Sequence, residues 1–140
     1  MLDASKTISG SFGYLHHEGD WLTNVSGFQS SVNINKEEVQ RAGTRWIGHK
    51  AISVVGSGSI TQFKITNDLV KRIGQFTDDK SPMFVTELIG KLDDPDSREG
   101  KTRIRYKGVQ FDVIPLMQYE VGTIVTEEIP FTFSGYEFLD

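Results

Sequence analysis

Three adjacent residues near the start of the chain, His16, His17 and Glu18, are the first candidates for metal binding or acid–base chemistry. Imidazole and carboxylate groups are both common zinc ligands. Adjacent residues of a strand point to opposite faces, however, so the two histidines cannot bind one ion without a distorted turn. Gly19 and Asp20 follow directly and favour a tight turn. We therefore expect a solvated hairpin turn here and no metal site.

A second candidate is the acidic segment 93–99, where carboxylates crowd together as they do in calcium loops. Its spacing lacks the alternating acidic pattern and the distal glutamate of a calcium-binding loop. Pro95 within the segment favours an ordinary turn. We expect a turn without calcium at the four acidic residues, which are Asp93, Asp94, Asp96 and Glu99.

The glycine-rich segment 56–59 is the only candidate for a phosphate-binding loop. It lacks the lysine of such loops and leads into a strand, so no helix N-terminus is available for an anion. We interpret it as flexible backbone. Because no Ser/His/Asp arrangement is visible either, we expect no enzyme activity and no cofactor.

A basic stripe alternates along one predicted strand, with four cations at every second position. A solvated strand face is one interpretation, because exposed charges commonly serve solubility. Pairing with carboxylates such as Glu120 and Glu128 on another strand or subunit is a second. Nucleic-acid binding is less favoured because the stripe lacks aromatic partners. The first two interpretations remain open for the four residues, Lys101, Arg103, Arg105 and Lys107.

Composition narrows the class of protein. The 140 residues include 15 basic and 19 acidic side chains, a net charge of −4 that argues against a general nucleic-acid or membrane-surface binder. The absence of cysteine excludes disulfides and thiolate chemistry. No stretch approaches the roughly 20 apolar residues that span a bilayer, so we expect one soluble domain covering 1–140.

The elements that would carry these residues are mostly strands. In segment 117–134 apolar side chains occupy almost every odd position and polar ones almost every even position. A straight strand of this length would reach about 60 Å, whereas a compact chain of this size is roughly 35 to 40 Å across. The strand must therefore bend, with Gly122 as a bulge, or pair partly with another subunit.

Shorter alternating segments predict further strands at 11–15, 21–25, 28–34, 60–65, 83–92 and 102–114, the last with a bulge at Gly108. One amphipathic helix is expected after Asn67, with an apolar face that packs on the sheet. That face comprises Leu69, Val70, Ile73 and Phe76.

Segment 35–59 breaks the strand pattern with charges and glycines, so we interpret it as a long excursion that acts as an interaction arm. Trp46, Ile47 and His49 are the residues expected to contact another subunit, because an apolar cluster in a polar arm is explained by docking. The alternative is that the arm folds back and buries Trp46 locally.

Several ordered stretches together resemble the tail tube proteins of contractile-tailed phages and of phage-derived particles such as PBSX-like prophages and R-type bacteriocins. The stretches are 7–10 with Gly13, then 48–50, 56–61, 92–97 and 127–133. The resemblance implies a mainly β fold, an antiparallel β-sandwich or half-barrel with one flanking α-helix that closes into a ring-shaped barrel on oligomerisation. It also implies contacts between subunits through the arm and residues 1–10.

The function implied by the resemblance is that of a structural subunit in the virion tail, assembled in the bacterial cytoplasm. Hexameric rings would stack into a hollow conduit for DNA inside a contractile sheath. The implied partners are further copies of the chain and the sheath, tape-measure, baseplate and terminator proteins, with no membrane. Our own inference is that Glu120 and Glu128 line the conduit, where an acidic wall repels the DNA backbone. A bacteriocin or secretion-type tube without DNA, and a monomeric β-barrel binding module, are the alternatives.

Overall fold

The computed structural model describes residues 4, 10, 13–64, 67–93 and 102–139. Among these residues, no helix is both long and apolar enough to cross a membrane. The elements are the strands β1 (Gly13–His17), β2 (Asp20–Trp21), β3 (Val25–Val39), β4 (Gly48–Phe63), β5 (Val85–Leu92), β6 (Thr102–Phe111), β7 (Thr126–Phe133) and β8 (Gly135–Phe138), with helix α1 (Asp68–Ile73) and a 3₁₀ turn (Gly74–Thr77) between β4 and β5.

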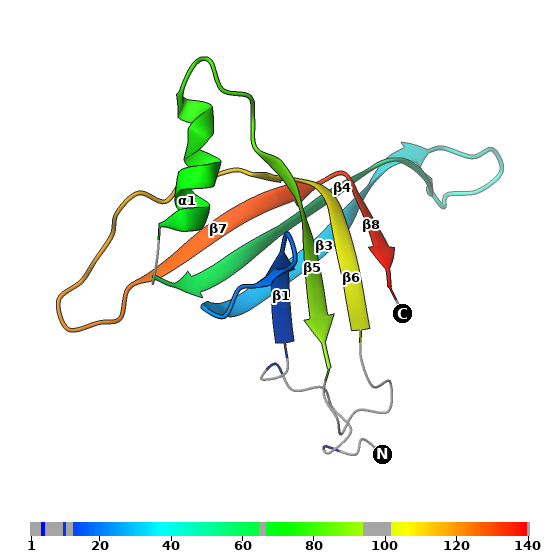
Figure 1. Ribbon diagram of the computed structural model, residues 1–140. Coiled ribbons are helices and arrows are strands. Elements are labelled where there is room, and N and C mark those ends of the chain that lie inside the picture. Colours follow the sequence, from blue (N-terminus) through cyan, green and yellow to red (C-terminus); the bar gives the residue numbers. More distant parts are fainter. Residues whose placement is uncertain (1–3, 5–9, 11–12, 65–66, 94–101, 140) are drawn as a thin grey trace.

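The eight strands form one antiparallel sheet that folds over on itself without closing (Figure 1). The order is β2-β1-β5-β6-β7-β4-β3, and β8 pairs with the first half of β6 while β7 pairs with its end. The ring of Phe28 on the edge strand β3 lies 5.6 Å from the ring of Tyr106 on β6, so this edge of the sheet folds over towards its middle. This arrangement confirms the predicted antiparallel half-barrel with one flanking helix.

The predicted bulge at Gly108 is present and turns β6 between its two partners. Tyr106 pairs with Leu88 and Val109 with Thr86, so two residues of β6 stand opposite one residue of β5. Gly108 has φ of +64°, a backbone conformation that side chains with a Cβ rarely adopt. An extra residue bends its strand, and here it lets β6 pair with β8 before the bulge and with β7 after it.

The core lies between the facing parts of the sheet and is rich in aromatic rings. Phe131 is fully buried and stacks on Phe28 at 5.8 Å, with Tyr106 and Phe111 edge-on to it. Alternation along β7 places Glu127, Ile129, Phe131 and Phe133 inside, as the odd-position pattern predicts for this part of the chain.

The expected strand over 117–134 is correct only from Thr126 onward. Residues 112–125 form an exposed loop, and Gly122 is a turn residue with φ of +88° instead of a bulge. Met117, Tyr119 and Val121 are 85%, 78% and 94% exposed. Alternation alone does not make a strand, and among the described residues no strand pairs with the backbone of this segment.

The strands that extend beyond the rest of the sheet are instead β3 and β4. They pair from Val25 with Gln62 to Val39 with Gly48, and the far half projects from the sheet as a two-stranded hairpin (Figure 1). We call residues 31–55 the hairpin and residues 40–50 its tip. The unstructured excursion expected at 35–59 was wrong, because regular pairing continues through most of it. Val32, Ile34 and Val54 alternate on one face of the projecting strands, but the charged run 36–38 interrupts the period-two pattern nearer the tip.

Helix α1 forms where it was predicted, with Val70 and Ile73 buried. Leu69 packs against the core cluster, but Phe76 is 54% exposed in the 3₁₀ turn, so the predicted apolar face ends one turn early. Arg72 forms an ion pair of 2.8 Å with Glu18 and ties the helix to the turn between β1 and β2.

Candidate assembly surfaces

The middle of the outer face of β3, β4 and β7, between the exposed side chains of Phe63 and Val55, carries mostly polar side chains, and we call it the polar face. The register aligns its residues in three rows across the strands. No cation and no large apolar side chain stands in these rows. The rows are Gly27–Thr61–Glu128, Gln29–Ser59–Pro130 and Ser31–Ser57–Thr132.

The opposite side of the same strands explains the glycine-rich segment. A Cβ on Gly56 would lie 2.4 Å from the ring of Phe133, and one on Gly58 would lie 2.7 Å from the ring of Phe131 and 2.3 Å from the carbonyl oxygen of Gln29. These glycines leave room for buried aromatic rings. The interpretation as flexible backbone was therefore wrong, since both positions lie within β4.

The two carboxylates expected to share one strand face are separated. Glu128 is exposed on the polar face opposite Thr61, whereas Glu120 is exposed in the loop 112–125. The argument that put them on one face assumed a strand through Glu120, and that assumption was wrong. Glu127 is buried and binds the amino group of Lys64 at 3.1 Å and the amide of Gln62 at 3.2 Å.

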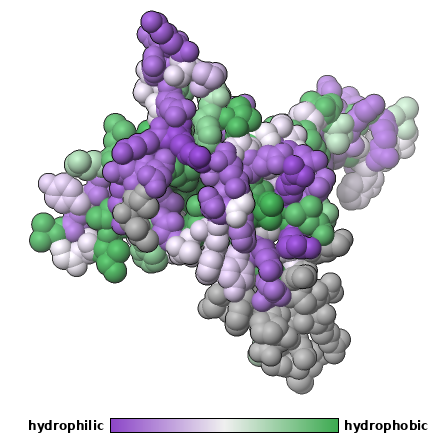
Figure 2. Space-filling model, viewed as in Figure 1, coloured by the Kyte–Doolittle hydropathy of each residue, from purple (hydrophilic) through white to green (hydrophobic). Residues whose placement is uncertain are grey.

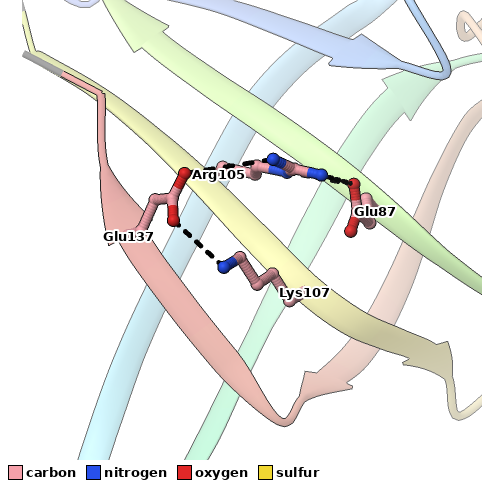
Figure 3. Close-up of polar contacts among 4 residues, drawn as sticks. All are labelled: Glu87, Arg105, Lys107 and Glu137. Atoms are coloured by element: carbon pink, nitrogen blue, oxygen red, sulfur yellow. Dashed lines mark hydrogen bonds and ion pairs between the residues drawn. The ribbon is translucent and has the colours of Figure 1, made fainter.

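The described cations of the basic stripe lie on the outer face of β6, and two of them, Arg105 and Lys107, pair with carboxylates on the neighbouring strands (Figure 3). Arg105 donates from Nε and Nη2 to one oxygen of Glu87 on β5, at 3.0 and 2.7 Å. Glu137 on β8 accepts from Lys107 at 3.0 Å and lies 3.9 Å from Arg105. Pairing with carboxylates on other strands, one of the two interpretations, is present, but within the chain the partners are Glu87 and Glu137. Lys101 lies outside the described residues.

These contacts shift the protonation equilibria of the network. The hydrogen bond from Lys107, with the charge of Arg105 adding to it, lowers the pKa of the Glu137 carboxyl. The hydrogen bond to Glu87 raises the pKa of Arg105. The third described cation of the stripe, Arg103, donates to the carbonyl oxygen of Leu139 at 3.4 Å. The network thus ties the final strand β8 to β6.

The tip of the hairpin presents Trp46, Ile47 and His49 to solvent. Trp46 is 79% exposed and Ile47 is 45% exposed. The backbone N–H of Trp46 donates to the Thr44 hydroxyl at 3.1 Å, and Arg41 donates to the Trp46 carbonyl at 3.4 Å. Within one chain the hairpin does not fold back to bury Trp46.

A second exposed apolar surface is the loop 112–125, most of which the sequence pattern had assigned to a long strand. Figure 2 shows apolar side chains gathered at the left of the view, where this loop lies. We call it the apolar loop. Its most exposed members are Leu116, Met117, Tyr119, Val121 and Ile124, each more than three quarters exposed.

His17 occupies a buried site, which corrects the expected solvated turn. The side chain is hydrogen-bonded to the Thr86 hydroxyl at 3.0 Å and packs edge-on against Phe84. Burial, reinforced by the charge of Arg72, lowers the pKa of His17 against the opposing effect of Glu18. Among the described residues, no group of three or more His, Asp or Glu side chains is placed to hold a metal ion. The expected acidic turn continues beyond Asp93 into residues outside the described part.

A groove of about 590 Å³ lies between the facing parts of the sheet. Its lining includes Tyr14, Trp21, Phe28 and Tyr106, which come from four strands. Sequence reasoning missed this aromatic lining because its members are far apart in the chain. Only the folding over of the sheet brings them together.

Comparisons with known proteins agree with this architecture. A family model described as "Phage tail tube protein" matches residues 1–140. The chain is 33% identical over 137 residues to the phage-like element PBSX protein XkdM of Bacillus subtilis (strain 168), covering 97% of this chain and 92% of that protein.

Two solved assemblies contain chains of similar fold. One is the sheath-tube complex of an extracellular contractile injection system in its extended state, with a TM-score of 0.74, 6% identity, and coverage of 96% of this chain and 93% of that one. The other is the tail of an empty gene transfer agent particle with C6 symmetry, with a TM-score of 0.53, 13% identity and full coverage of both chains. The family match over the whole sequence and the identity to XkdM show that the chain belongs to the phage tail tube protein family.

Proposed function

We propose that copies of this chain close into hexameric rings and that the rings stack into a hollow conduit for DNA inside a contractile sheath. The role is structural and involves no catalytic step. The open sheet supports ring formation, because the outer edge of β3 and the free edge of β8 carry unpaired backbone groups among the described residues. Closing such edges against neighbouring copies removes sites of uncontrolled pairing. The sixfold symmetry of the related tail suggests the number of copies.

The observation that carries the conduit is the composition of the polar face. The wall of a conduit for DNA must be hydrophilic but must not attract the phosphates, because each contact from a basic side chain adds salt-dependent affinity for DNA. The three rows of this face hold hydroxyl, amide and proline side chains and one carboxylate, Glu128, with no cation. We therefore assign the polar face to the lumen, with Glu128 as its charged residue.

The opposite outer face suits contact with protein. Arg103 and the network of Glu87, Arg105, Lys107 and Glu137 place both signs of charge on β5, β6 and β8. Mixed charges of this kind steer a partner into register. We propose that this face and the exposed tip residues Trp46, Ile47 and His49 contact neighbouring subunits. Residues 1–10 and Lys101 remain further proposed contacts.

Electron microscopy of the purified protein at low and high concentration tests the assembly. We expect rings or hollow tubes of uniform width. Monomers that persist even when preformed baseplates are added as nucleators would refute the proposal. A phage tube and a bacteriocin tube differ in whether DNA passes, so the lumen needs its own test.

A charge reversal at Glu128 tests the lumen assignment. Tubes of Glu128→Lys would carry one added cation per subunit inside the conduit and should retain short duplex DNA on sedimentation at low salt, in a salt-dependent way. Asp79→Lys, which makes the same charge change at an exposed residue outside the sheet, is the matched control. Equal DNA retention by the two variants would contradict the assignment.

A further inference from the structure

The apolar loop exposes most of its large apolar side chains to solvent. Five of its fourteen residues are large apolar side chains that are each more than three quarters exposed. Contiguous apolar surface of this kind marks an interaction site in a folded protein. A long loop without secondary structure in a compact domain is also typically functional.

The loop has a defined shape of its own. The Thr123 hydroxyl and backbone N–H both donate to the carbonyl of Glu120, at 2.8 and 3.2 Å, and Gly122 closes this turn with φ of +88°. Gln118 donates to the carbonyl of Thr126 at the start of β7. These contacts hold Tyr119 and Val121 outward, so a partner would meet a partly preorganised surface.

We propose that the apolar loop of one copy is the docking surface for the hairpin tip of a neighbouring copy. This inference rests on the self-association proposed above and names the two surfaces that meet. Within one chain the loop and the tip project from opposite sides of the fold (Figure 1). A contact between them therefore joins two copies, head to tail, which is the arrangement that generates rings and stacks.

The charges of the two surfaces are complementary. The tip contains Arg41, Arg45 and Lys50 and no carboxylate, whereas the loop contains Asp112 and Glu120 and no cation. Neither Arg45 nor Glu120 forms an ion pair with another described residue, so both charges remain available to a partner. Opposite charges of this kind fix the register of an interface and exclude wrong pairings.

The apolar content of the two surfaces is also suited to contact. Trp46 and Arg45 at the tip and Tyr119 and Met117 in the loop are of the types most enriched in protein interfaces. Trp46 would supply a large ring, and the thioether of Met117 would adapt to it.

Paired cysteines test the contact directly, because the natural chain has none. The double variant Ala42→Cys with Val121→Cys places one thiol in the tip and one in the loop, both at exposed positions. Under mild oxidation of an assembled sample, head-to-tail docking should give a ladder of dimers, trimers and larger species. The control double variant is Ala42→Cys with Asp79→Cys. It should give about tenfold less material above the dimer, because docking would not hold its two thiols close together and so would not raise their effective concentration.

Charge exchange provides an independent readout. Arg45→Glu and Glu120→Arg should each raise the concentration needed for assembly about tenfold, and the two substitutions in one chain should restore it. Circular dichroism of each variant checks that the chain is folded.

The outcomes separate this inference from the proposed function. A ladder specific to the tip and loop pair, together with rescue by the charge exchange, supports the docking. Rings or tubes seen by microscopy with equal ladders from both cysteine variants would overturn the docking while leaving the tube intact. Folded protein that forms neither particles nor ladders would overturn both.

Discussion

Gly58 offers the sharpest test of how the sheet is held together. It sits in β4 between Ser30 of β3 and Phe131 of β7. A methyl group in the place of its α-hydrogen would lie 2.3 Å from the backbone oxygen of Gln29 and 2.7 Å from the ring of Phe131. Both distances are well inside van der Waals contact, and Phe131 is fully buried, so neither neighbour can move away freely.

The expected cost follows from that geometry. Replacing glycine by alanine within a strand normally stabilises it by roughly 0.5 to 1 kcal/mol. Overpacking a closed core costs about 1 to 3 kcal/mol and more where backbone must shift. We expect Gly58→Ala to lower the free energy of unfolding by about 3 kcal/mol, at the upper end of that range, because a strand must separate. For a domain of this size the melting temperature should fall by about 10 °C.

Gly27→Ala is the matched control, because it lies in the same sheet but its Cβ would meet only the Thr61 side chain, at an ordinary 3.5 Å. Denaturant unfolding of both variants at concentrations where the protein is monomeric gives the comparison. If Gly58→Ala were no less stable than Gly27→Ala, the close packing of rings on the glycine segment would be refuted.

Four further variants test the polar contacts of the core. Because the pKa of His17 is lowered, its contribution to stability is complete above about pH 6.5 and is lost as the pH falls toward the folded-state pKa. In the His17→Gln variant, the free energy of unfolding should therefore change less with pH over that range. Lys64→Met leaves the buried carboxylate of Glu127 without its ion-pair partner and should lower the free energy of unfolding by about 2 kcal/mol. Glu127→Gln, measured by the same denaturation, should lower it much less. Tyr106→Phe removes a 2.6 Å hydrogen bond to Ser30 and should cost about 1 kcal/mol by thermal melting; an unchanged midpoint would show that this bond contributes nothing.

The parts of the fold that could be predicted are those where one face is buried. The alternation of β7 from Glu127 to Phe133 and the bulge at Gly108 follow from burial and from backbone conformation, which are local properties. The same alternation misled over 117–125, because a sequence pattern does not reveal whether a neighbouring strand exists. The outer part of the hairpin, beyond the strand predicted at 28–34, was missed for the opposite reason, since both of its faces are exposed and its charged residues 36–38 do not alternate with apolar ones.

The candidate surfaces were predictable only in part. The exposure of Trp46 agrees with its position in a polar segment. Carboxylate pairing of the basic stripe was one of two open interpretations, and the identity of its partners Glu87 and Glu137 depended on strand order. The polar face required the register of three strands that are distant in sequence. His17 appeared solvated because the sequence gives no sign that Phe84 and Thr86 would cover it.

The hairpin also has a mechanical consequence. Its pairing is unbroken except at one irregularity between Asn35 and Lys36, where Ile52 is the extra residue on β4. Extra residues are places where a ribbon bends, and nearly the whole outer half of the hairpin lies beyond this one. A rotation of about 5° there would swing a tip roughly 15 Å away by about 1 Å, given a rise of about 3.3 Å per residue. In the proposed assembly, bending at this irregularity would let the tip follow small differences in the spacing of neighbouring subunits without distorting either sheet.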